Sequence, residues 1–252
     1  MRTALRAFVL LLLVWTYGSA ATRSDINTIE AAEKIRYLSQ KIAKDYLHLY
    51  SRPKRIELKK EIQVMIDDLG QNFEAIADST KDSNTKDLLK YLDYNKQSME
   101  ELLTQKVTKN GSLQMLDYSE ILLEGADSIA REHRYPFNPE ETMLMNIKRY
   151  EYLVERLGKF YMASSLGALS QANRKKMETS RRALEEGLQT IKSYQYPAYL
   201  REQKKELERF WHSSTFILSH AYDMFIPNLV NITSTYFEHL LTQFALYHSK
   251  SQ

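Results

Sequence analysis

The residues with the clearest chemical potential lie close together near the start of the chain. Arg36, Ser39 and Gln40 fall within five residues, and Lys44 follows four residues later. Steps of three and four bring side chains to one face of a helix. This face would offer a guanidinium fork, a hydroxyl, an amide and an ammonium, and we interpret it as an edge that binds a ligand or a partner. The alternative is a solvated face on which Arg36 pairs with Glu33.

Other residue types that carry chemistry do not form recognisable sites. The six histidines include no His-x-x-x-His or His-x-His spacing, and Glu208 with His212 supplies only two potential ligands for a metal. No Gly-x-Ser-x-Gly turn presents a nucleophile, no Gly-rich loop could hold a phosphate, and the chain has no cysteine. We therefore expect no enzyme activity, no cofactor and no metal.

The first 21 residues are typical of an export signal. Arg2 and Arg6 form a basic region, residues 7–17 are apolar, and residues 18–21 are mostly small and suit cleavage. An apolar run of about 11 residues is too short to span a bilayer comfortably, although an uncleaved N-terminal anchor is the alternative. We expect an exported protein, periplasmic or secreted, without a transmembrane span after cleavage.

The charge of the chain gives no indication of nucleic-acid binding. Without Arg2 and Arg6, 33 basic residues face 32 acidic ones, so the net charge is close to +1. The basic cluster at 52–55 is short, and we interpret it as a solvated helix start. An exported protein without disulfides must be held together by burial of a core, and this length is ample for that.

Long helices must position these side chains. Gly and Pro are scarce, at 7 and 5 of 252 residues, and charges of both signs are evenly mixed, which favours helices. Apolar residues recur at helical steps of three and four throughout. The first such stripe comprises Ile35, Leu38, Ile42, Tyr46 and Leu49. Narrow stripes on charged helices need partners that bury them, and four such helices predict an up-down bundle.

The chain repeats itself at an offset of 115 residues. Residues 37–47 reappear as residues 152–162. The aligned pairs include Leu38 with Leu153, Lys44 with Lys159, Leu69 with Leu184 and Ser119 with Ser234. We therefore predict an all-α fold of two tandem four-helix up-down bundles related by duplication, with residues 22–134 in the first and 135–252 in the second. The recurring lysine indicates either duplication alone or a binding role.

Turn residues separate the stripes. Asn-Gly-Ser at 110–112 is expected to separate the third helix from the fourth. The two repeats meet at Tyr-Pro-Phe-Asn-Pro, 135–139, where Asn138 is placed to cap a helix and Glu141 completes a capping box. In the second repeat only Gly and Ala at 167–168 stand where the first repeat has Pro53, and the first two helices are therefore expected to be continuous or merely kinked.

The opening segment resembles a known family. Residues 29–44, which read IEAAEKIRYLSQKIAK, resemble the first helix of the PilJ-type domain, the N-terminal region of type IV pilus methyl-accepting chemotaxis transducers. That domain is related to the sensor module of NarX-type nitrate sensor kinases. The residues that match the family pattern are Ile29, Ala32, Arg36, Leu38, Ser39, Gln40, Ala43 and Lys44. The resemblance implies a helical sensory domain in chemotaxis or two-component signalling, with a membrane sensor or transducer as partner.

The chain departs from the family pattern at acidic positions. The family's Asn and Gly fall on Glu30 and Glu33, and in the second repeat the motif arginine falls on Glu151. In nitrate-sensing relatives the motif's basic residue helps to bind an anion between subunits, and carboxylates near Arg36 would oppose a small anion. The fold is therefore expected to carry over better than the ligand, and the first repeat to be the competent one.

Two functions are consistent with these observations. The first is an exported, non-catalytic sensory or binding module that binds a small ligand or a membrane-receptor partner. The alternative is a structural or assembly protein of the cell envelope without a small-molecule pocket. A polar cleft around Arg36 would favour the first, and a dry core there with an exposed apolar patch elsewhere would favour the second. Tyrosines clustered on the first helices of both repeats indicate packing between the bundles or a homodimer.

Overall fold

The part of the chain described by the computed structural model, residues 23–167, 170–220 and 226–251, is helical and contains no strand. The predicted all-α class is confirmed. The predicted signal peptide, residues 1–21, lies outside the described residues. The helices are α2 (Arg23–Ser51), α3 (Ile56–Ser79), α4 (Ser83–Thr104), α5 (Lys109–Glu132), α6 (Pro139–Ser165), α7 (Gln171–Ser193), α8 (Arg201–Ser219) and α9 (Pro227–Lys250).

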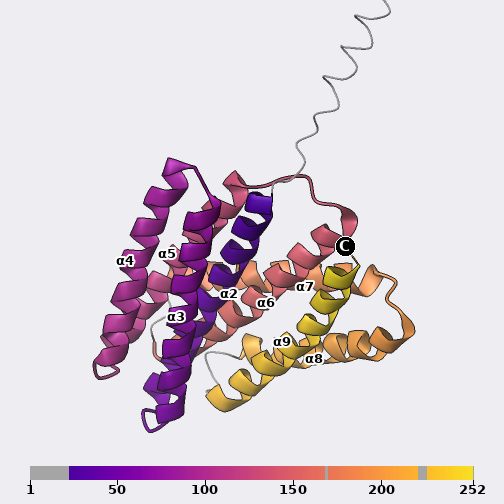
Figure 1. Ribbon diagram of the computed structural model, residues 1–252. Helices are drawn as coiled ribbons and strands as arrows, with labels where there is room; N and C mark the ends of the chain where they lie inside the picture. Colours follow the sequence, from indigo (N-terminus) through magenta and orange to yellow (C-terminus); the bar gives the residue numbers. More distant parts are fainter. Residues whose placement is uncertain (1–22, 168–169, 221–225, 252) are drawn as a thin grey trace, which may run out of the picture.

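Helices α2 and α6 lie at the centre of the structure and pack against each other (Figure 1). Helix α2 also contacts α3 and α5, and α4 contacts both of these. Helix α6 also contacts α7 and α9, and α8 contacts both of these. The helices are therefore arranged as one group, α2–α5, and a second group, α6–α9, which meet along α2 and α6.

Each group has its own hydrophobic cluster. The stripe predicted on α2 is buried along its whole length, and it packs against apolar residues of α3, α4 and α5. The cluster of the second group also includes three residues from the first group, namely Leu47, Leu116 and Leu123. Apolar packing on α2 and α5 therefore continues across the contact between the groups.

The segment at 135–139 opens α6 as predicted. The Asn138 side chain accepts a hydrogen bond from the backbone N–H of Glu141 at 2.9 Å, and the Glu141 carboxylate accepts one from the N–H of Asn138 at 2.8 Å. Pro139 is the first helical residue. Both halves of the capping box are therefore formed, and the entry into the central helix of the second group is fixed.

Two connections between helices differ from the sequence-based prediction. The prediction that residues 110–112 separate two helices is wrong, because α5 begins earlier, at Lys109. Thr108 supplies the cap by accepting a hydrogen bond from the N–H of Gly111 at 3.1 Å. The prediction that the first two helices of the second repeat are continuous or kinked is wrong, because α6 ends at Ser165 and α7 begins at Gln171. Gly167, in this connection, has a φ of 62°, a conformation that favours glycine.

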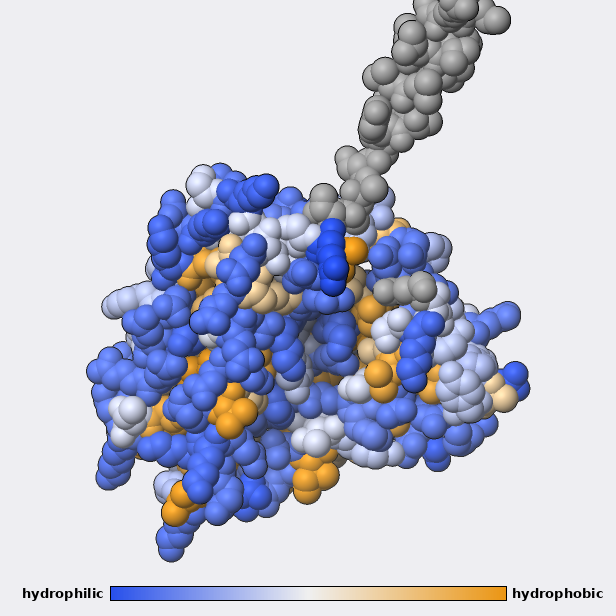
Figure 2. Space-filling model, viewed as in Figure 1, coloured by the Kyte–Doolittle hydropathy of each residue, from blue (hydrophilic) through white to orange (hydrophobic). Residues whose placement is uncertain are grey.

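The face shown in Figure 2 is mostly hydrophilic, and apolar residues show on it as separate small patches. Among the described helices, none is both long enough and apolar enough to cross a bilayer.

Leu38 and Leu153, which correspond at the offset of 115 residues, are 2% and 3% exposed. Replacing either with Ala removes buried methyl groups and leaves a cavity. We expect each variant to lose about 2–5 kcal/mol of unfolding free energy, and the two losses to be similar. Urea denaturation followed by circular dichroism measures both. A loss below about 1 kcal/mol in either variant would show that its stripe does not face a core.

Candidate functional site

The contact between α2 and α6 contains two buried ammonium groups. Lys44 on α2 is 1% exposed, and Lys159 on α6 is fully buried. A buried ammonium is stable only when hydrogen-bond acceptors and opposite charge surround it. The partners of these lysines therefore fix how the two helices meet.

Each lysine finds its partners in the other group of helices. Lys44 donates to Glu155 of α6 at 2.9 Å and to the hydroxyl of Ser234 of α9 at 2.8 Å. The approach is close because Gly158 of α6 has no side chain, and a Cβ there would lie 2.9 Å from Cδ of Lys44. A side chain of the first group is therefore anchored in the second.

Lys159 makes the reciprocal connection. It donates to the amide oxygen of Gln40 at 2.5 Å, to the hydroxyl of Ser119 at 2.9 Å and to Glu120 at 2.7 Å. Gln40 in turn donates to the backbone carbonyl of Ser119 at 2.9 Å. Glu120 also pairs with Arg156 of α6 at 2.5 Å. The three hydrogen-bond partners of Lys159 all belong to α2 and α5.

The two sets of partners correspond at the offset of 115 residues. The pairs are Lys44 with Lys159, Gln40 with Glu155, and Ser119 with Ser234. The sequence did indicate these residues, because lysine and serine recur at positions 115 residues apart. The spacing could not indicate that each lysine side chain reaches the other group of helices and not a ligand.

The pKa values of the side chains in this contact reflect two opposed effects, because burial favours the neutral form and a nearby opposite charge favours the charged form. Burial alone would raise the pKa of Glu120, but Lys159 and Arg156 hold it well below its ordinary value. Burial lowers the pKa of Lys159 to about 8, against the attraction of Glu120. Beside Lys44, burial and the charge of Glu155 raise the pKa of Glu238 to about 9.

The four predicted site residues are divided between two places. Gln40 and Lys44 lie in the buried contact just described. The hydroxyl of Ser39, also buried, donates to the backbone carbonyl of Arg36 at 2.9 Å. The Arg36 guanidinium pairs with Glu33 on α2 and with Asp127 on α5, the latter at 2.5 Å. Of these four predicted residues, only Arg36 lines a cleft.

That cleft has a volume of about 180 Å³ and lies between α2, the end of α5 and the start of α6. Four arginines line it, namely Arg36, Arg131, Arg134 and Arg149. Among the described residues, no carboxylate forms an ion pair with the last three. Sequence reasoning missed them because they come from α5, the 133–138 segment and α6, and each alone reads as a solvated charge.

One buried carboxylate, Glu33, borders the cleft. It is 8% exposed, and it also lines a second cleft of about 450 Å³ between α2, α6 and α9. Its Oε1 pairs with Arg36, and its Oε2 has no hydrogen-bond partner among the described residues. Burial raises the pKa of Glu33 to about 7, despite the charge of Arg36. The carboxylate that would oppose an anion here can therefore take up a proton near neutral pH.

No group of three or more His, Asp or Glu side chains in the described ranges could hold a metal ion. The chain matches no protein-family model, and no curated protein or solved structure is significantly similar to it.

The buried pair of Lys44 and Glu155 provides a direct test of the contact. We expect Lys44→Met to cost about 3–5 kcal/mol of unfolding free energy, because Glu155 is left buried without its main partner. The double variant Lys44→Met with Glu155→Leu should recover much of that loss, since both charges are then absent. Urea denaturation of the single and double variants measures the coupling.

An exposed ion pair is the matched control. Lys90 and Asp87 approach to 2.8 Å, with both side chains mostly exposed. Lys90→Met should change stability little, because solvent screens such pairs. Equal losses from Lys44→Met and Lys90→Met would contradict the burial described here.

Proposed function

We propose that the protein is an exported, non-catalytic binding module and that the cleft beside Arg36 receives a small anion. The observation that carries this proposal is that four arginines line one cleft, three of them without an ion-pair partner among the described residues. Like charges gathered at short range repel one another, and an anion among them relieves that repulsion.

The chemistry of the lining favours a carboxylate or a phosphate. Guanidinium forks match the geometry of these groups and bind them with two parallel hydrogen bonds. The backbone carbonyls at the end of α5 attract a positive charge, and this explains why Arg131 lies in the last turn of that helix. It does not account for Arg149, which lies on α6. A shared anion accounts for both.

The size of the cleft favours a small ligand. Pockets for drug-sized molecules measure about 300–1,000 Å³, whereas this cleft measures about 180 Å³. Asn146 and Phe137 complete the lining with an amide and an aromatic ring. A compact mono- or dicarboxylate, or inorganic phosphate, fits this combination of volume and charge.

We also propose that the chain consists of two tandem four-helix up-down bundles, residues 22–134 and 135–252, related by duplication. The reciprocal partners of Lys44 and Lys159 support this interpretation. A second correspondence at the same offset is independent of them. His133 lies 3.1 Å from Asp25, and His248 lies 2.5 Å from Glu140.

These histidine contacts join equivalent helix ends. In each case the carboxylate lies in the first turn of the first helix of its group, and the histidine lies at or just beyond the end of the fourth helix. The chance recurrence of two unrelated polar arrangements at one offset is small. The interpretation favours one module used twice, as the sequence repeat predicts.

An assembly role is the second candidate function. Large exposed apolar side chains would support it, and several exist, including Val64 on α3, Tyr94 on α4, Phe216 on α8 and Ile232 on α9. They are distributed over four helices, and the face in Figure 2 shows separate patches. A binding site therefore has more support than a docking surface. A membrane sensor or transducer remains the partner that the PilJ-type resemblance implies.

The proposal is tested by isothermal titration calorimetry with phosphate, sulfate, nitrate and succinate. We expect at least one of them to bind the wild-type protein. Arg134→Ala and Arg149→Ala should each weaken that anion about ten-fold or more, because a hydrogen bond to a charged group is worth about 1.5–3 kcal/mol. Arg36→Ala is less informative, since it also removes the partner of buried Glu33.

Arg201→Ala is the matched control. Arg201 is an exposed arginine at the start of α8 and does not line the cleft. This variant should bind the anion like the wild type. The proposal is wrong if none of the four anions binds, or if the anion that binds does so equally well in Arg134→Ala, Arg149→Ala and wild type.

Glu33 gives a prediction for pH. Its pKa rises from an ordinary value of 4.5 to about 7 in the folded protein, where Arg36, Asp127, Lys148 and Arg149 surround it. The folded state therefore binds more protons between these values, and stability falls as pH rises from about 4.5 to 7. Glu33→Gln removes that loss.

We expect Glu33→Gln to be more stable than wild type at pH 8 by about 1–3 kcal/mol, and to differ little from it at pH 4. Guanidinium chloride denaturation across this pH range measures the difference. A constant difference at all pH values would rule out the assigned titration.

A further inference from the structure

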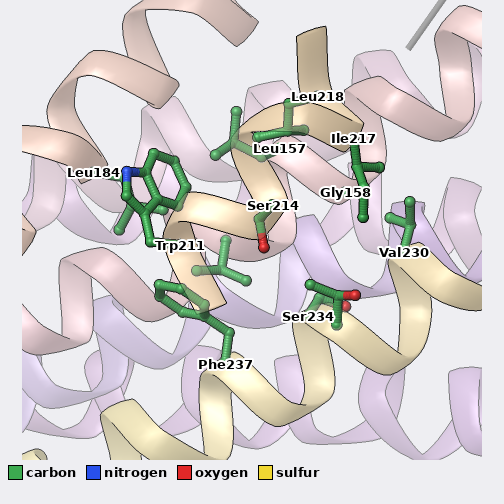
Figure 3. Close-up of a pocket in the computed structure, with 12 residues that line it drawn as sticks. Leu157, Gly158, Leu184, Trp211, Ser214, Ile217, Leu218, Val230, Ser234 and Phe237 are labelled. Atoms are coloured by element: carbon green, nitrogen blue, oxygen red, sulfur yellow. The ribbon is translucent and has the colours of Figure 1, made fainter. Parts of the chain in front are cut away.

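The second group of helices contains a pocket that has no part in the anion cleft. It lies among α6, α7, α8 and α9 and has a volume of about 50 Å³ (Figure 3). Figure 3 shows Trp211 and Ser214 of α8 on one side, and Val230, Ser234 and Phe237 of α9 on the other. The pocket is partly open to solvent, and Trp211 and Ile217 in its lining are half-buried.

The first group of helices has larger side chains at two places that correspond to this pocket. At the offset of 115 residues, Ser214 corresponds to Met99 and Val230 to Met115. Both methionines are fully buried in the cluster of the first group. Methionine is flexible and fills irregular gaps in cores. The second group has smaller side chains at the same places, and the space remains open.

The two serines that line the pocket already donate their hydroxyl protons within the protein. The hydroxyl of Ser214 donates to the backbone carbonyl of Phe210 at 2.8 Å. The hydroxyl of Ser234 accepts from Lys44 at 2.8 Å and donates to the backbone carbonyl of Asn231 at 3.1 Å. Apart from the Thr233 hydroxyl and the indole N–H of Trp211, the rest of the lining is apolar or glycine. An apolar cavity remains dry and binds apolar molecules, so this mostly apolar lining favours an apolar occupant.

The volume restricts the occupant further. A cavity of about 150 Å³ holds benzene, and this pocket is about one third of that size. A ring is too large for it, whereas the end of an unbranched chain can enter through the open side. We propose that this pocket binds the end of an aliphatic chain, with the indole of Trp211 and the ring of Phe237 as its aromatic walls.

Trp211 provides a fluorescent reporter within the pocket wall. The chain has one other tryptophan, Trp15, so the variant Trp15→Phe isolates the signal of Trp211. The experiment titrates this variant with 1-octanol and, for comparison, with cyclohexanol. We expect a saturable change in fluorescence with the linear alcohol and a response at least about ten-fold weaker with the ring, equivalent to about 1.4 kcal/mol.

Two variants close the pocket with the residues of the first group. Val230→Met and Ser214→Met, each in the Trp15→Phe background, should weaken 1-octanol by at least about ten-fold. Their melting temperatures identify a variant that fails to fold, and either folded variant suffices for the test. Leu229→Met and Ser213→Met are the matched controls, because these exposed neighbours add the same side chain outside the pocket.

Saturable binding of 1-octanol that is lost in the pocket variants and kept in the controls supports the proposal. A fluorescence change that does not saturate would overturn it, as would 1-octanol binding that is unchanged in a folded Val230→Met or Ser214→Met protein. Binding of cyclohexanol as tight as that of 1-octanol would overturn the assignment of a chain rather than a ring.

Discussion

Two ammonium groups held out of water determine how this molecule is assembled. Lys44 and Lys159 each need anionic and hydroxyl partners, and each obtains them from the other group of helices. Because unpaired buried charge is costly, α2 and α6 can meet in one register only. Arg36, which lines the arginine-lined cleft, lies about two turns before Lys44 on α2. Ser234, which accepts a hydrogen bond from Lys44, lines the apolar pocket. Both candidate sites are thus built on this contact.

Helix periodicity made most of the fold predictable. Apolar steps of three and four identified the buried stripe of α2, and the capping box at Asn138 located the start of α6. The turn at 110–112 was misplaced because Asn-Gly is a strong local turn signal, whereas the cap comes from Thr108 and Gly111 is needed inside α5 beneath Tyr46. Two local signals competed at this boundary, and the Thr108 cap together with the packing of Gly111 against Tyr46 decided it.

The site was less predictable than the fold. Helical spacing grouped Arg36 with Gln40 and Lys44, but spacing cannot distinguish a face that meets solvent from one that meets another helix. The sequence identified one arginine of the cleft, and the other three became visible as a group only when α5 and α6 were placed beside α2. Charges that converge from separate segments leave no signal in a single sequence.

The partner set of each lysine has a symmetric property. Gln40, Ser119 and Glu120, which hold Lys159, all belong to the same group of helices as Lys44, and Glu155 and Ser234 belong to that of Lys159. Each group therefore carries both a lysine and the kind of polar groups that hold such a lysine. Two copies of one group could exchange these contacts across a twofold axis, as in an isologous dimer. The short junction at 133–138 makes that association intramolecular, so its strength no longer depends on protein concentration but on an effective concentration set by the tether.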